Sequence, residues 1–245
     1  MYALFQPRSI VSQDPTLSER NGEGMLWGAG ILLATLIDAR PALVNQRRII
    51  ELGAGVGLVS MVAQLHGPLS MVATEQPGAA MAWLKRNHAA NPDAGAMQCK
   101  SLFWGTANAR SFQAGPVDLI LGADIMYARD VHGLLLETLL ELATVDTEIL
   151  LAHDDSSVPH CDQHRHRFLA LARDEFIVTT VDLADARFRS PDIHVYSLRR
   201  RAEKKQGPGG QPSAATAAEC TAPAPHKAKL VGRRRAGMSV RRRPG

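Results

Sequence analysis

The sequence predicts an α/β fold whose seven-stranded, mostly parallel sheet ends in an antiparallel hairpin and carries helices on both faces. Between Trp27 and Tyr196, short apolar runs alternate with longer amphipathic stretches, which is the pattern of repeated β-α units. Several of these runs are almost continuously apolar, as in strands buried on both faces. Only Leu183–Asp192 separates the last two runs. That is too short for a crossover helix, so these two strands are expected to pair antiparallel.

The expected elements follow one another in alternation. The strands, each a short apolar run, are predicted at Arg48–Leu52, Ser70–Thr74, Ala96–Leu102, Val117–Gly122, Glu148–His153, Glu175–Asp182 and Ile193–Leu198. The helices, which have apolar residues at helical spacing, are predicted at Leu26–Ala39, Gly57–His66, Gly78–Ala90, Val131–Ala143 and Asp162–Asp174. Asn91-Pro92 is expected to end the third helix, because proline cannot continue it.

Size and composition indicate one intracellular domain. The chain has 245 residues, of which 45% are hydrophobic, and a mean hydropathy of −0.11. That is enough for one sizeable core. No apolar run approaches the ~20 residues of a membrane span, and the N-terminus lacks the apolar core of a secretory signal. The three cysteines are widely spaced, which is typical of a reducing compartment. We therefore expect a cytoplasmic location, a nuclear one, or both.

The basic charge of the chain is concentrated at its C-terminus. From Arg199 onward, 13 Lys and Arg face only Glu203 and Glu219, so this part has a net charge of +11 and the preceding residues −7. The composition predicts an N-terminal arm (1–24), a folded domain (25–199) and a disordered basic tail (200–245). Arginine triplets in the tail suggest contact with a polyanion or an import receptor, while a merely solvated extension is the alternative.

The sharpest motif is a glycine-rich turn after the first strand, Glu51-Leu52-Gly53-Ala54-Gly55-Val56-Gly57-Leu58. Glycines permit positive φ and close approach of the backbone to a ligand, and the next helix presents free N–H groups there. A dinucleotide-binding turn requires its third glycine at position 58, which is leucine. The spacing therefore favours S-adenosylmethionine, which has no diphosphate. Glu51 is expected to face the cationic end of that cofactor.

A second acidic residue supports a nucleoside cofactor. Glu75 ends the second predicted strand, eighteen residues after Gly57. A carboxylate at this place can accept hydrogen bonds from both ribose hydroxyls. The alternative is an ordinary solvated acid at a strand end, but the glycine turn upstream favours the ribose role.

Further motifs occur in the order found in a known family. They are Leu26-Trp27-Gly28-Ala29-Gly30, the glycine turn, Ser101-Leu102-Phe103-Trp104-Gly105, Asp118–Tyr127 and Asp192–Tyr196. Together they resemble the small seven-β-strand protein-lysine methyltransferases of the "methyltransferase-like" group, family 16, over about Trp27 to Arg199. The resemblance implies a Rossmann-like fold, and the known targets of that family include chaperones and translation factors.

The resemblance also implies a site and a partner. S-adenosyl-L-methionine is the implied cofactor, and its contacts correspond to Trp27, Gly53, Ala54, Gly55, Glu75, Trp104 and Ala123. The family's acidic-x-x-aromatic motif is here Asp124-Ile125-Met126-Tyr127, so Asp124 and Tyr127 are the implied catalytic residues at the acceptor site. The implied partner is a protein that supplies an acceptor lysine. Core packing for Trp27 and Trp104, and helix capping for Asp124, are the structural alternatives.

Methyl transfer to lysine requires an aligned, neutral amine and the exclusion of water. Free lysine has a pKa of ~10.4, which a desolvated channel lowers. We expect Asp124 to orient this amine, and Tyr127 and Trp104 to form apolar walls that favour a cation. The motif lacks the paired prolines typical of enzymes that methylate nucleic-acid bases. A histidine, nucleic-acid or small-molecule acceptor, or a non-catalytic binding module, remain the alternatives.

The segment His153–His166 is rich in metal-ligand residue types, among them His160, Cys161 and His164. Their spacing matches no compact four-ligand pattern, so no metal site is predicted. In the related enzymes this segment follows the fifth strand near the substrate entrance, so the resemblance implies a substrate-facing loop.

Overall fold

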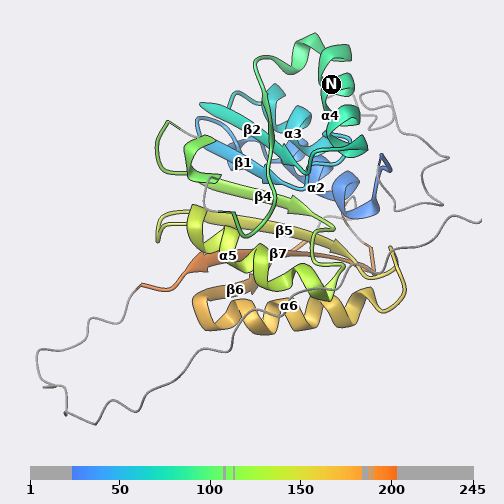
Figure 1. Ribbon diagram of the computed structural model, residues 1–245, viewed down its shortest axis with the longest axis vertical. Coiled ribbons are helices and arrows are strands. Elements are labelled where there is room, and N and C mark those ends of the chain that lie inside the picture. The colour runs from blue at the N-terminus through green and yellow to red at the C-terminus, as the bar shows by residue number, and fades with distance from the viewer. Residues whose placement is uncertain (1–23, 107–108, 113, 184–187, 189, 203–245) are drawn as a thin grey trace, which may run out of the picture. The chain divides into compact units, whose positions relative to one another are not determined.

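The computed structural model describes residues 24–106, 109–112, 114–183, 188 and 190–202. The predicted arm before residue 24 and the predicted tail from residue 203 lie outside the described residues. The structure contains a seven-stranded sheet in the order β3-β2-β1-β4-β5-β7-β6 (Figure 1). Its strands are β1 Arg48–Leu52, β2 Ser70–Glu75, β3 Gln98–Ser101, β4 Leu119–Ala123, β5 Glu148–Asp154, β6 Phe176–Thr180 and β7 Ile193–Arg200.

The pairing of the strands confirms the predicted fold class. All neighbouring pairs from β3 to β5 are parallel, whereas β7 is antiparallel to both β5 and β6. β7, the last strand in sequence among the described residues, therefore lies between β5 and β6. The predicted hairpin is present, but its insertion beside β5 could not be derived from the sequence pattern.

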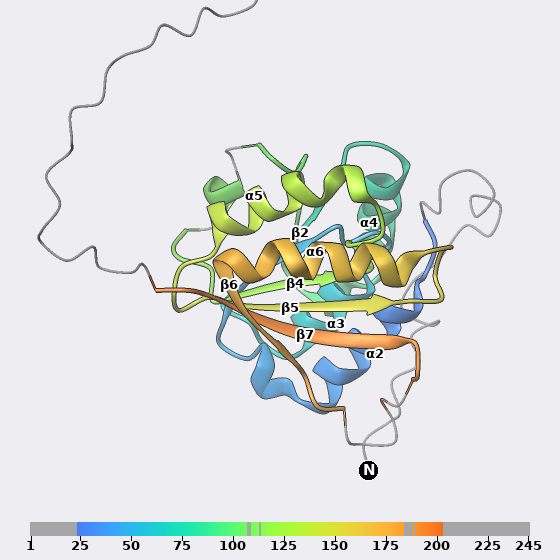
Figure 2. The same cartoon turned by 90° about the horizontal axis from the view of Figure 1, so that it is seen from below.

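In the part of the chain that the structure describes, five longer helices cover the two faces of the sheet. They are α2 Gly28–Ala39, α3 Leu58–Leu65, α4 Ala79–Ala90, α5 His132–Leu142 and α6 Cys161–Glu175. Buried side chains of α2, α3 and α4 form one core cluster with one face of the sheet, and those of α5 and α6 form a second with the other face. Figure 2 shows α5 and α6 on one side of the sheet and α2 and α3 on the other.

Side-chain alternation along β1 divides these two cores. Ile49 belongs to the cluster with α2, α3 and α4, while Ile50 and Leu52 belong to the cluster with α5 and α6. A strand buried on both faces explains the continuous apolar run in the sequence. The same alternation directs Glu51 toward α3.

The predicted boundaries agree with the observed ones to within about two residues at most ends. As expected, α4 ends at Ala90, before Asn91-Pro92. The third strand is shorter than predicted, Gln98–Ser101, because it pairs only with β2 at the edge of the sheet and its side chains are mostly exposed. Among the described residues, no helix has the length and apolar character needed to cross a bilayer.

Candidate functional site

One cavity brings together most of the predicted site residues. It has a volume of about 730 Å³ and lies where β1, β2 and β4 end and the segments after β3 and β5 begin. Parallel strands deliver their carboxyl ends to one edge of a sheet, which is the usual ligand position in such folds. The predicted residues that line it are Trp27, Gly53, Gly55, Glu75, Trp104, Ala123, Asp124 and Tyr127.

The glycine turn after β1 forms part of the cavity wall. Gly53 has a φ of 64°, and a Cβ there would lie 2.8 Å from Cγ2 of Ile125, so no side chain fits. Gly55 has a φ of 53°, but an added Cβ would meet no described atom within 4 Å. The backbone at Gly55 therefore borders open space, where a ligand can approach it closely.

Glu75 is held beside this turn. Its Oε2 accepts a hydrogen bond from the Gly55 N–H at 2.8 Å, and its Oε1 accepts one from the Gln76 N–H, also at 2.8 Å. Two carboxylate oxygens together offer about four acceptor positions. Because this carboxylate also lines the cavity, it lies where it can accept hydrogen bonds from a pair of vicinal hydroxyls.

Glu51 does not line the cavity. Its side chain is 2% exposed and accepts a hydrogen bond at Oε2 from the Ser60 hydroxyl of α3. Burial raises the pKa of Glu51 to about 8, and the hydrogen bond from Ser60 opposes this only in part. Glu51 thus lies beneath the glycine turn, linking β1 to α3. Ala54 is also buried and does not line the cavity.

Asp124 follows β4 in a left-handed backbone conformation, with a φ of 52°. Such a conformation is uncommon for a residue other than glycine and is concentrated at functional sites. Its N–H donates to Ala152 O at 2.9 Å, and its Oδ1 accepts from the Asp154 N–H at 2.8 Å. Burial raises the pKa of Asp124 to about 7, although the amides of Asp154 and Ala29 act in the opposite direction.

Aromatic and aliphatic side chains make up the rest of the wall. Tyr127, Phe103 and Leu134 are exposed by 44%, 56% and 44%, although each lines the cavity. Trp27 and Trp104 are half-buried, and Trp104 also packs on the α5–α6 core. The cavity therefore opens to solvent past an apolar rim.

Eight lining residues were not predicted. They are Gln76, Leu102, Phe103, Ile125, Val131, Leu134, Ser157 and Val158. Gln76, Phe103 and Ile125 are direct neighbours of predicted residues, so adjacency was the available signal. Nothing in the apolar pattern of α5 distinguished Leu134, which is exposed beside the site.

The histidine-rich segment is a loop only in part. His153 lies within β5, which ends at Asp154, and α6 begins at Cys161, so residues 155–160 form the connection. From this connection, Ser157 and Val158 line the cavity. Within the described residues, no three His, Cys, Asp or Glu side chains are grouped as metal ligands.

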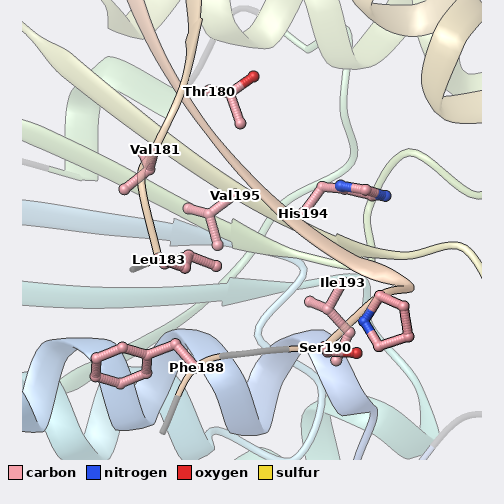
Figure 3. Close-up of a pocket in the computed structure, with 9 residues that line it drawn as sticks. Thr180, Val181, Leu183, Phe188, Ser190, Ile193, His194 and Val195 are labelled. Carbon is pink, nitrogen blue, oxygen red and sulfur yellow. The ribbon is translucent and has the colours of Figure 1, made fainter. Parts of the chain in front are cut away.

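A second cavity of about 380 Å³ lies over β6, β7 and the segment between them (Figure 3). Its described walls are mainly apolar and include Val181, Leu183, Phe188, Ile193 and Val195. None of the predicted site residues lines it. The cavity at the glycine turn is therefore the candidate active site.

Comparison with known proteins agrees with this geometry. Residues 13–174 match the model of a family described as lysine methyltransferase. The chain is 35% identical to protein N-lysine methyltransferase METTL21A of Danio rerio, over 80% of this chain and 84% of that protein. It is 33% identical to EEF1A lysine methyltransferase 3 of Mus musculus, over 52% of this chain and 53% of that protein.

Solved structures share the fold at lower identity. A ribosomal protein L11 methylase from Lactobacillus delbrueckii subsp. bulgaricus superimposes with a TM-score of 0.53 at 20% identity. The superposition covers 82% of this chain and 91% of that one.

The burial of Glu51 predicts a pH dependence of stability. Its pKa is about 8 in the folded protein against 4.5 as the reference value, so the folded state retains the proton more strongly. This contribution to stability is complete below pH 4.5 and is lost as the pH rises through 8. We expect the free energy of unfolding to decline over this interval by up to ~1.4 kcal/mol per pH unit.

Glu51→Gln should flatten this decline, because glutamine does not ionise and still accepts a hydrogen bond from Ser60. Urea unfolding of both proteins between about pH 5 and 8 measures the difference in slope. Asp124 contributes a slope of the same sign in both proteins. Identical slopes in the wild type and the variant would contradict the buried, protonated state of Glu51.

Proposed function

The chain belongs to the lysine methyltransferase family, and we propose on that premise that its main cavity holds both the cofactor and the acceptor lysine. The protein is an S-adenosylmethionine-dependent protein-lysine methyltransferase. We place the cofactor in one half of the cavity and the acceptor lysine in the other, and the observation that supports this division is the sheet order β2-β1-β4-β5. It spreads the lining residues from Glu75 and Gly55, beside the cofactor, to Asp124 and Tyr127, beside the acceptor.

The cofactor half suits a nucleoside with a cationic sulfonium. Bound S-adenosylmethionine supplies the electrophilic methyl group. Glu75 would receive its ribose hydroxyls, and the open space at Gly55 would admit the ligand against the backbone. Trp27 and Trp104 would cover it with aromatic surface, which excludes water and favours a positive charge. Glu51 would act from below the turn, through the position of β1 and α3.

In the acceptor half, Asp124 would receive the lysine side chain. A protonated amine is no nucleophile, so the ammonium must lose a proton before it attacks the methyl group. The pKa of Asp124, about 7, is roughly 3 lower than the pKa of lysine, ~10.4. Moving the proton from the ammonium to this carboxylate therefore costs ~5 kcal/mol, and desolvation of the amine lowers this cost. With the ordinary carboxyl pKa the cost would be ~9 kcal/mol. Burial of Asp124 therefore makes it a better proton acceptor.

Tyr127 and the apolar rim support a protein as the acceptor. The exposed side chains of Phe103, Tyr127 and Leu134 form a shallow apolar mouth that a protein surface around a lysine can contact. The name of the mouse relative makes EEF1A the first acceptor to test.

Gly55→Arg should abolish cofactor binding, because the new side chain projects into the cavity. We expect the dissociation constant for S-adenosylmethionine, measured by calorimetric titration, to rise by about 100-fold or more. The positive φ should cost about 1–2 kcal/mol of stability. Gly67→Arg is the matched control, since Gly67 also has a positive φ of 71° but does not line the cavity, and it should bind normally. Unchanged binding by Gly55→Arg would exclude the proposed cofactor position.

Asp124→Asn should separate binding from chemistry. Asparagine tolerates the left-handed conformation and keeps the shape of the side chain, but it cannot take a proton. We expect tritiated methyl transfer into EEF1A or into extract protein to fall about 100-fold or more, while cofactor affinity stays within about threefold. Asp130→Asn, at an exposed acid in the turn before α5, is the control. Normal transfer by Asp124→Asn would refute the assignment of the acceptor site.

The basic tail offers a second level of interaction. We propose that its two arginine triplets, Arg233–Arg235 and Arg241–Arg243, contact a polyanion or an import receptor and give the enzyme a nuclear as well as a cytoplasmic population. Replacing both triplets by alanine should abolish nuclear accumulation of a fluorescent fusion. An unchanged distribution would leave the tail without this role.

A further inference from the structure

A buried histidine lies directly behind the proposed acceptor site. His153, in β5, is fully buried, and its Nδ1 lies 3.6 Å from Oδ1 of Asp124. Neither Nδ1 of His153 nor Oδ2 of Asp124 makes a hydrogen bond of ordinary geometry within the described residues, although the amide of Ala29 acts on the Asp124 carboxyl. Two buried polar atoms without partners in one site are costly unless the site uses them.

The opposite side of the ring determines which nitrogen carries the proton. Nε2 of His153 lies 3.1 Å from the carbonyl oxygen of Cys161. Sγ of Cys161 also lies 3.2 Å from Nε2, but a thiol is only a weak donor, whereas the carbonyl is a strong acceptor. We therefore assign Nε2 as the donor to the carbonyl. In the neutral ring, Nδ1 is then a bare acceptor directed toward Asp124. Burial lowers the pKa of His153, which keeps the ring neutral.

The surrounding charges leave this arrangement in place. Asp155 lies 3.8 Å from Nε2, but Arg165 donates two hydrogen bonds to its carboxylate, at 2.8 and 2.7 Å. These bonds hold the pKa of Asp155 below its usual range, although burial acts the other way. The titratable and charged groups around the pair are Asp154 of β5, Asp155 after it, and Cys161 and Arg165 of α6. His194 of β7 contacts Asp155.

We propose that His153 is a positioning residue that stabilises the proton removed from the acceptor lysine, by accepting a hydrogen bond at Nδ1 from the neutral carboxyl of Asp124. An N–H bond of the ammonium breaks and an O–H bond forms on Asp124. The freed lone pair of the amine then forms the N–C bond to the methyl group, while the methyl–sulfur bond of S-adenosylmethionine breaks and leaves its electron pair on sulfur. The carboxyl turns about its Cβ–Cγ bond to present the proton to His153. The separation of 3.6 Å then shortens to about 2.8 Å, as catalytic hydrogen bonds do when the substrate binds.

The tautomer and its coupling to Asp124 can be measured without any acceptor. In the full-length protein labelled with ¹⁵N-histidine, the Nδ1 signal of His153 should be that of a bare nitrogen above about pH 8. It should shift toward a hydrogen-bonded acceptor near pH 7, as Asp124 takes its proton. Asp124→Asn should abolish this change. A proton on Nδ1 throughout, or the same titration in Asp124→Asn, would overturn the proposal.

A kinetic test follows from the same bond. Glutamine at position 153 can still donate to the Cys161 carbonyl, but its amide oxygen is a weaker and differently placed acceptor than the ring nitrogen, so His153→Gln should lower the pKa of Asp124 and weaken it as a base. We expect initial rates of tritiated transfer into extract protein to fall about 10-fold or more, with the acid limb of the pH profile about one unit lower. Asp124→Asn serves as the blank for these rates. Calorimetry should find cofactor affinity within about threefold of the wild type.

His66→Gln is the matched control, because His66 forms a separate pair with Asp38, 3.0 Å away and outside the cavity wall. It should leave the rate and the profile unchanged. A slower His153→Gln enzyme with an unmoved acid limb would show a merely structural role and contradict the proposal.

This inference rests on the proposed function, yet the two can fail separately. If the wild type transfers no methyl group while the Nδ1 signal still follows Asp124, the proposed function fails and the proton sharing stands. If transfer occurs and the Nδ1 signal does not change when Asp124 is protonated, only the proposed hydrogen bond between Asp124 and His153 fails.

Discussion

The parallel pairing of β2, β1, β4 and β5 is the constraint on which the site depends. Its register brings the carboxyl ends of these strands to one edge, so the residues that follow them meet although they lie far apart in the chain. Glu75 bonds to Gly55 across β2 and β1, and Asp124 bonds to the backbone of Asp154 across β4 and β5. A slip of one residue between two strands would break these bonds and turn core side chains to the wrong face.

Burial raises the pKa of two acids near this edge, but the two carboxyls have different roles. Glu51 is enclosed beneath the turn and joins α3 to β1, so its protonated carboxyl has a structural role. Asp124 is equally enclosed on one side, but its carboxyl also borders the cavity. The same desolvation that raises the pKa of a structural carboxyl therefore produces, one strand away, a base suited to an amine.

The sequence predicted most of the fold because the periodicity was strong. Continuous apolar runs identified the buried parallel strands, and Asn91-Pro92 identified the end of α4. Strand order is a matter of non-local pairing, so the place of β7 beside β5 was not visible locally. Glycine spacing and strand-end acids were sufficient to collect Gly55, Glu75 and Asp124 around one cavity.

The parts of the site that the sequence did not predict depend on which way a side chain points rather than on its residue type. Whether Glu51 faces the cavity or α3 is decided by side-chain alternation at the end of β1. Leu134 lies on a helix whose apolar pattern looks like core, and only packing shows that it is exposed. The contact of His153 with Asp124 joins the ends of two strands, so the histidine-rich segment by itself predicted only a substrate-facing loop.

The position of β7 has a consequence for biosynthesis. β5, which carries His153 and ends at Asp154, has no partner on its outer side until β7 has been made. β6 pairs only with that same strand. While the chain emerges from the ribosome, both strands therefore expose open hydrogen-bonding edges. Chains that stop before residue 193 would keep those edges and be prone to aggregate, so a holding chaperone is needed until β7 has been made.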